Sequence, residues 1–208
     1  MAYFPFFFEV NRLKGVVIGG GRIALEKIEK LDAYEAELTV IAPEILPKIY
    51  EYKCVKNIVR REFEEGDLEE ADYVIAATDI IELNGRVRQL CRGRHLPVNV
   101  VDNQALCDFI FPSVYKRGPL VVGVSSSGAS PQVAIELRKQ FEENTPDNIE
   151  EILDYLASIR PYVKEKVTNP KIRHHLFGDI ARESMRLGRA LEQAELEQLI
   201  SSAASTQI

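Results

Sequence analysis

The sequence predicts an α/β fold in which a parallel sheet is followed by a short strand–helix segment and an all-α C-terminal region. The stretch "VVIGGGRIALEK" (16–27) passes from an apolar run through a glycine-rich turn into a helical pattern. Apolar runs of strand length then alternate with helix-length segments, which is typical of βαβ units. These runs are nearly continuous rather than alternating, so we expect helices on both faces of the sheet.

The composition narrows the class of protein. The 208-residue chain is 46% hydrophobic and 28% charged, as in globular proteins with a real core. Its net charge of −6 argues against a general nucleic-acid surface, which needs a basic field. No apolar run approaches the roughly 20 residues of a membrane span, so no membrane partner is expected. Three widely spaced cysteines and the lack of a signal-peptide pattern favour the cytoplasm.

Strand-length runs and helical spacing define the expected order of elements up to residue 102. Apolar residues at helical spacing predict crossover helices at about 24–31 and 81–91. The runs that read as strands are 6–10, 15–20, 37–42, 71–79 and 96–102.

From residue 109 the pattern changes. Two further strand-like runs flank a turn at Arg117–Pro119, and a helix is expected to follow with Ser130 as its N-cap and Pro131 in its first turn. Another amphipathic helix begins at about Ile149, and Pro161 is expected to bend or end it.

The remainder of the chain predicts one or two more helices. We therefore expect three parts: a dinucleotide-binding domain at 1–112, a strand–helix segment at 113–145 and a helical domain at 146–208.

The glycine-rich turn matches the pattern G-x-G-x-x-G/A through Gly19, Gly21 and Ala24. In a Rossmann-type sheet the first glycine permits the tight turn and the second lets the backbone approach a pyrophosphate. The start of the following helix offers amide groups and a positive dipole end to the same anion. The context of strand, turn and helix therefore predicts dinucleotide binding.

The ribose end of this site is less clearly marked. A carboxylate usually ends the second strand, but this strand closes on Ala42 and Pro43, and Glu44 stands two residues past the expected place. Glu44 could reach the ribose or could cap a helix that follows Pro43, and both interpretations stay open. Because no arginine occupies this turn to meet a 2′-phosphate, the pattern favours NAD over NADP.

Two later strands end on polar residues. Thr78 and Asp79 follow one of them and are expected to touch the nicotinamide half of the cofactor or the substrate, or to cap the next helix. Asp102 ends "NVVD", where a carboxylate could take a proton while the cofactor takes a hydride. Asn99, on the same strand, is a candidate substrate contact. A turn-forming role for Asp102 is the alternative.

The segment "SSSGASP" (125–131) places hydroxyl groups against a helix start. Ser125, Ser126 and Ser127 are therefore candidate ligands for a carboxylate or phosphate on the substrate, and a simple loop with a cap is the alternative. No cluster of residues has the spacing of a metal site, so no metal is expected.

Together these stretches resemble the precorrin-2 dehydrogenase / sirohydrochlorin ferrochelatase family, the dehydrogenase module of siroheme synthase. The resemblance covers about two-thirds of the chain. It rests on "FPFFFEV", "VVIGGGRIALEK", "LTVIAPE", "VIAATD", Asn84 with "RV" after it, "VNVVDNQALCDFIFPS" and "GPLVVGVSSSGASP".

The resemblance implies a Rossmann domain, a dimerisation segment, a helical domain and a homodimer. It implies NAD-dependent oxidation of precorrin-2, a tetrapyrrole, to sirohydrochlorin; some family members also insert Fe²⁺, and the sequence leaves that activity open. Asp102 matches the proposed catalytic aspartate, and Ser126 matches the serine of the anion-binding loop. The cofactor contacts that carry over are Gly21, Arg22, Ile23, Pro43 and Glu44.

A substrate with eight carboxylates needs cationic contacts despite the acidic chain, and Lys116 and Arg117 are candidates beside the serine loop. The alternative to an enzyme is a non-catalytic NAD-sensing or tetrapyrrole-binding module. A carboxylate expected beside the nicotinamide favours the enzyme.

Overall fold

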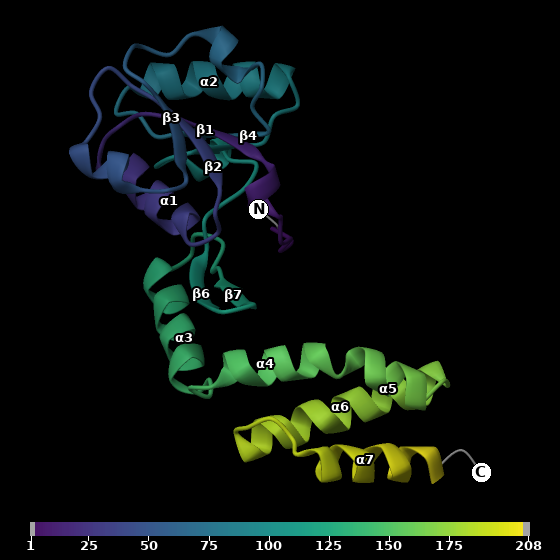
Figure 1. Ribbon diagram of the computed structural model, residues 1–208. Helices are drawn as coiled ribbons and strands as arrows, with labels where there is room; N and C mark the ends of the chain where they lie inside the picture. The colour runs from purple at the N-terminus through teal and green to yellow at the C-terminus, as the bar shows by residue number, and fades with distance from the viewer. Residues whose placement is uncertain (1–2, 206–208) are drawn as a thin grey trace. The chain divides into compact units, whose positions relative to one another are not determined.

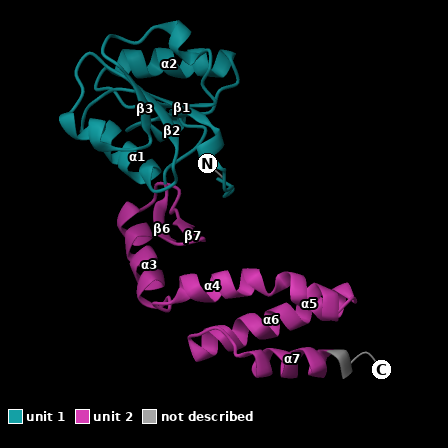
Figure 2. Cartoon of the chain, in the orientation of Figure 1, with its two compact units in different colours: residues 1–111 teal, residues 112–208 magenta. Residues whose placement is uncertain are grey.

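The computed structural model describes residues 3–205, with side chains up to residue 203. The chain divides into two compact units, Met1–Phe111 and Pro112–Ile208, coloured separately in Figure 2. Each unit has its own hydrophobic core. The division of the second unit at residue 145 stays a prediction.

The first unit is built on one parallel sheet of five strands. Its order reverses at β1, because the chain first adds strands on one side of β1 and then returns to its other side. Such a switch point opens a crevice at the carboxyl ends of the strands. The predicted α/β fold is confirmed. In spatial order the strands are β3 (Val55–Val59), β2 (Glu37–Ile41), β1 (Lys14–Ile18), β4 (Tyr73–Ala76) and β5 (Val98–Val100).

The sheet is covered on both faces, as its nearly continuous apolar strands require. Helix α1 (Arg22–Asp32) packs on the face that carries Val17, and α2 (Ile81–Gly93) packs on the face that carries Val16 and Ile18. Figure 1 shows the two helices on opposite sides of the sheet. Short 3-10 helices complete the unit: Val10–Arg12 (η1), Pro47–Glu51 (η2), Glu65–Leu68 (η3) and Gln104–Leu106 (η4).

Two elements differ from the sequence prediction. The run 6–10 is not a strand, and Phe6, Phe7 and Phe8 are at least 71% exposed. Aromatic residues gave this run its strand-like appearance, but no described strand pairs with it. Strand β3 was missed, because it is a half-exposed edge strand whose polar residues interrupt the apolar pattern.

The second unit starts with an antiparallel hairpin of β6 (Ser113–Arg117) and β7 (Leu120–Val124), joined at the predicted turn, where Gly118 has φ +53°. Helix α3 (Pro131–Glu143) follows, and the Ser130 hydroxyl accepts the Val133 N–H at 3.3 Å, as predicted for its N-cap.

The remaining helices form a separate core that includes Val163, Leu176 and Ile180. The predicted break at Pro161 is confirmed, since one helix ends at Ser158 and the next starts at Arg160. Of the described helices, none has the length and apolar character needed to cross a membrane. The helices that follow α3 are α4 (Ile149–Ser158), α5 (Arg160–Lys166), α6 (Pro170–Leu187) and α7 (Gln193–Ser205).

Replacing Ile28 tests the packing of α1. Its side chain is 0% exposed, and Ile28→Ala should lower the free energy of unfolding by about 2–5 kcal/mol through lost burial and a residual cavity. The matched control is Ile81→Ala on α2, because Ile81 is 79% exposed and little packing is lost. Urea denaturation followed by circular dichroism measures both. Equal stability of the two variants would contradict the described packing.

Candidate functional site

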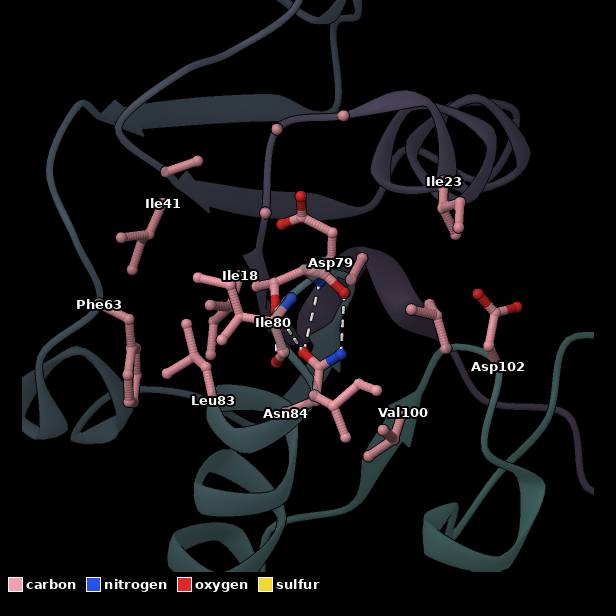
Figure 3. Close-up of a pocket in the computed structure, with 18 of the residues that line it drawn as sticks. Ile18, Ile23, Ile41, Phe63, Asp79, Ile80, Leu83, Asn84, Val100 and Asp102 are labelled. Atoms are coloured by element: carbon pink, nitrogen blue, oxygen red, sulfur yellow. Dashed lines mark hydrogen bonds between the residues drawn. The ribbon is translucent and has the colours of Figure 1, made fainter.

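A cleft of about 1190 Å³ lies at the carboxyl ends of the strands in the first unit. The turns that follow β1, β2, β4 and β5 all contribute to its lining. Phe63 marks one end, and Ile23 and Asp102 lie together at the other (Figure 3). The cleft therefore occupies the switch point, where α/β sheets bind their ligands.

The three glycines after β1 differ in how much space their surroundings leave for a side chain. Gly19 has φ +121°, and a Cβ there would lie 2.2 Å from the Ala77 carbonyl oxygen. A Cβ on Gly20 would lie 2.3 Å from the Glu44 carbonyl oxygen. A Cβ on Gly21 would meet nothing within 4 Å. The fold therefore requires the first two glycines, whereas Gly21 leaves space at the surface of the cleft, as a closely approaching pyrophosphate needs.

Gly21 is also the N-cap of α1 and has no side chain to cap the helix amides. Arg22 and Ile23 follow in the first turn; both line the cleft, and both are exposed. An uncapped helix start that faces a cleft can donate backbone N–H groups to an anion. The residues present thus fit the pyrophosphate of a dinucleotide.

The turn after β2 supplies the lining beside Gly20. Pro43 and Glu44 are exposed there, and the Leu46 N–H donates to the Gly20 carbonyl at 2.9 Å. The next helix is the 3-10 helix that starts at Pro47, and its N-cap is Leu46. The alternative in which Glu44 caps a helix is therefore wrong, and Glu44 lines the cleft.

The turn after β4 is held by a buried asparagine. The Thr78 hydroxyl donates to Asn84 Oδ1 at 2.8 Å, and Asn84 Nδ2 donates to the Thr78 carbonyl at 2.9 Å. Asn84 is only 7% exposed, and Figure 3 shows its amide directed at this turn. The Thr78 hydroxyl is thus engaged within the protein, although Thr78 and Asp79 both line the cleft.

Sequence reasoning did not assign Asn84 a site role. A signal existed, because Asn84 shares a helical face with Val87 and Cys91, where an apolar residue is expected. The alternative in which Thr78 or Asp79 caps α2 is wrong, because no side chain caps this helix. The Thr78 hydroxyl accepts the Ile80 N–H at 3.2 Å, but the N-cap residue of α2 is Ile80 and not Asp79.

Asp102 follows β5 by two residues, and its side chain is exposed in the cleft. Its backbone is left-handed, with φ +57°, a conformation that aspartate tolerates better than most residues. The Cys107 thiol holds this turn, accepting the Val100 N–H at 3.2 Å and lying 3.1 Å from the Val100 carbonyl oxygen. The turn therefore presents a carboxylate from a fixed backbone.

Asn99 has a structural contact that spacing alone does not reveal. Its side-chain N–H donates to the Phe109 carbonyl at 2.9 Å, and the residue is 6% exposed. It lines a smaller recess next to the cleft, to which Asp102 also contributes.

The other predicted substrate contacts lie in the second unit and line neither cavity. The Ser126 hydroxyl bonds both the N–H and the carbonyl of Ser130, each at 2.9 Å, while Ser125 and Ser127 are exposed. Lys116 is exposed on β6, and Arg117 pairs with Asp147 at 3.5 Å. Among the described residues no group of three His, Cys, Asp or Glu side chains could hold a metal ion.

A parallel sheet with a glycine turn and an uncapped helix start at its switch point defines a dinucleotide-binding domain. Residues 6–113 match the family model described as "Putative NAD(P)-binding", which covers more than half of the chain. The chain belongs to this family. The match confirms the prediction of an NAD-type cofactor.

Curated relatives are siroheme synthases. That of Ruthia magnifica subsp. Calyptogena magnifica is 31% identical over 215 residues, covering 100% of this chain and 46% of the relative. That of Sodalis glossinidius is 36% identical over 211 residues, covering 97% and 44%. The chain thus spans less than half the length of these relatives. They confirm the resemblance predicted from the motifs.

A solved structure, "SirC, precorrin-2 dehydrogenase", matches with a TM-score of 0.71 at 20% identity, covering 98% of this chain and 100% of that one. At this identity the likeness establishes the fold.

Replacing Gly19 and Gly21 separately distinguishes the glycine that the fold requires from the glycine that ligand binding requires. Gly19→Ala should destabilise the protein, because the new methyl group would overlap the Ala77 carbonyl in a strained backbone. Gly21→Ala should leave the thermal midpoint nearly unchanged and weaken NAD binding, measured by calorimetry, by about tenfold or more. Unchanged NAD affinity in a folded Gly21→Ala variant would place the pyrophosphate elsewhere.

Replacing Asn84 tests the turn after β4. Asn84→Ala removes both bonds to Thr78 and should cost about 1–3 kcal/mol of stability, because the groups it leaves lie at a partly buried turn. NAD affinity should also fall as the turn loosens. Gln89→Ala, which shortens an exposed amide on the same helix, is the control. Equal thermal midpoints and equal NAD affinities would show that Asn84 does not support the site.

Proposed function

We propose that the chain is a cytoplasmic, NAD-dependent dehydrogenase that oxidises precorrin-2 to sirohydrochlorin in siroheme biosynthesis. The observation that carries this proposal is the exposed Asp102 carboxylate at the end of β5, in the same cleft as the glycine turn. The siroheme synthase relatives supply the class of substrate. A sheet that only senses NAD has no need for a carboxylate at this position.

Oxidation of precorrin-2 removes a hydride and a proton from the tetrapyrrole. NAD, when bound, supplies the acceptor for the hydride. Asp102 is proposed to accept the proton, and its exposure lets it pass that proton on to water. Overall, precorrin-2 and NAD⁺ give sirohydrochlorin, NADH and one proton.

The cofactor orientation follows from the lining of the cleft. The adenosine is proposed to lie toward Pro43 and Glu44, and the pyrophosphate at Gly21, Arg22 and Ile23. The nicotinamide then lies toward the ends of β4 and β5. Three features support this arrangement: the open space at Gly21, the position of Glu44 beside the proposed ribose site, and the position of Asp102 at the opposite end of the cleft.

The choice of NAD over NADP has support from Arg61. Arg61 follows β3 and does not line the cleft. Its guanidinium donates two hydrogen bonds to the Asp67 carboxylate, at 2.6 and 2.8 Å, and is therefore not directed at a 2′-phosphate. Glu44 and Glu62 instead line the cleft, where a 2′-phosphate would meet their negative charge.

A homodimer is part of the proposal. Helix α3 exposes Val133, Leu137 and Phe141 by 52%, 49% and 41%, which is typical of a helix face that a partner covers. Ser125, Ser126, Ser127, Lys116 and Arg117, in the same unit, are proposed to contact substrate carboxylates. Fe²⁺ insertion into sirohydrochlorin would need a base for the pyrrole N–H protons, and Asp102 is the candidate.

The test is the oxidation of precorrin-2 by the purified chain with NAD. Asp102→Asn should reduce kcat by about a hundredfold or more while leaving the Kd of NAD within about twofold, because only the proton acceptor is lost. Formation of sirohydrochlorin and of reduced nicotinamide, followed by absorbance, measures the rate. The control is Asp154→Asn, the same change at an exposed position of α4.

Binding of NAD without turnover by the unaltered chain would favour the non-catalytic binding module instead. Full activity of Asp102→Asn would remove Asp102 from the chemistry. Incubating sirohydrochlorin with Fe²⁺ and no NAD tests metal insertion separately.

A further inference from the structure

Lys27 lines the same recess as the proposed catalytic residue Asp102, although it is absent from the lining of the cleft itself. It is on α1, close after the glycine turn, and its Nζ lies 4.7 Å from the centroid of the Phe111 ring. The side chain lines a recess of about 260 Å³. The other residues around this recess are Asn99, Val100, Val101, Asp102, Asn103, Gln104, Cys107 and Ile110.

The recess adjoins the cleft. Asp102 and Asn103 line both, so the turn after β5 forms the wall between the two spaces. A molecule large enough to lie over Asp102 would therefore reach from the cofactor cleft into this recess. Precorrin-2 is such a molecule, because acidic side chains extend from every side of its ring.

The Lys27 ammonium is half-buried and forms no ion pair with a carboxylate among the described residues. Burial is the main reason that the pKa of Lys27 is lowered, and the nearby Lys30 lowers it further. The charge of Asp102 acts in the opposite direction. A cation that folding has already partly stripped of water gains more from a bound anion than an exposed lysine does.

We propose that Lys27 binds a peripheral carboxylate of the tetrapyrrole in this recess and so fixes the ring edge against Asp102. The inference rests on the proposed function for the identity of the ligand. The Phe111 ring centroid lies 4.7 Å from the Lys27 Nζ, and this cation–π contact favours the position of the ammonium in the recess. Lys27 is thus a substrate-positioning residue, distinct from the proton acceptor.

The experiment compares three variants of the full chain. Lys27→Met keeps an apolar stem against Phe111 and removes the charge, Lys27→Arg keeps the charge, and Lys30→Met removes an exposed lysine from the same helix. Steady-state kinetics with precorrin-2 are measured beside the Kd of NAD and the thermal midpoint. The Kd of uroporphyrin, an octacarboxylate tetrapyrrole, is measured by fluorescence without NAD.

Lys27→Met should raise the KM for precorrin-2 and the Kd of uroporphyrin about tenfold or more, the loss expected for one charged hydrogen bond. Its kcat, NAD affinity and thermal midpoint should stay close to those of the unaltered chain. Lys27→Arg should recover most of the affinity, and Lys30→Met should lose none.

Unchanged KM and uroporphyrin affinity in Lys27→Met, with the unaltered chain active, would overturn the inference and leave the proposed function intact. A fall in kcat alone would also overturn it, because Lys27 would then act on the chemistry of Asp102. Lys27-dependent binding of uroporphyrin by a chain that does not oxidise precorrin-2 would support the carboxylate site and refute the proposed function.

Discussion

The close packing of the glycine turn against the end of β4 is the constraint on which the candidate site depends. Gly19 lies where any Cβ would overlap the Ala77 carbonyl, and the Ala77 N–H donates to Ile18 at 2.8 Å. The turns after β1 and β4 can therefore pack together and form one continuous surface at the base of the cleft. Gly21 is left at the open side of that surface, at the start of α1, where an anion can approach the backbone.

The two turns that carry polar site residues are held by hydrogen bonds from side chains of other elements. Asn84 fixes Thr78, and Cys107 fixes the backbone on either side of Asp102. Burial raises the pKa of the Cys107 thiol, so this residue acts as a neutral hydrogen-bonding group. The arrangement fixes the backbone that carries Asp102 and leaves its side chain exposed, as the proposed role of proton acceptor requires.

Local patterns predicted much of this molecule. The glycine turn, the cap of α3 at Ser130 and the break at Pro161 depend on a few neighbouring residues, and short-range rules describe them well. Strand β3 depends on pairing with β2 across a sheet edge, so its own residues carry little signal. The contacts of Asn84 and the role proposed for Lys27 depend on which elements the fold brings together, and spacing along the chain does not encode that.

The central claim is that NAD binds in one cleft, with its adenine ribose near Pro43 and its nicotinamide near Asp102. A crystal structure of the chain with NAD bound measures this directly, through the distance between the nicotinamide C4 atom and the Asp102 carboxylate. The account predicts that the pyrophosphate contacts the Gly21 amide and that the nicotinamide and Asp102 face one space large enough for the substrate ring. A dinucleotide bound in the reverse direction, or a nicotinamide separated from Asp102 by packed side chains, would contradict it.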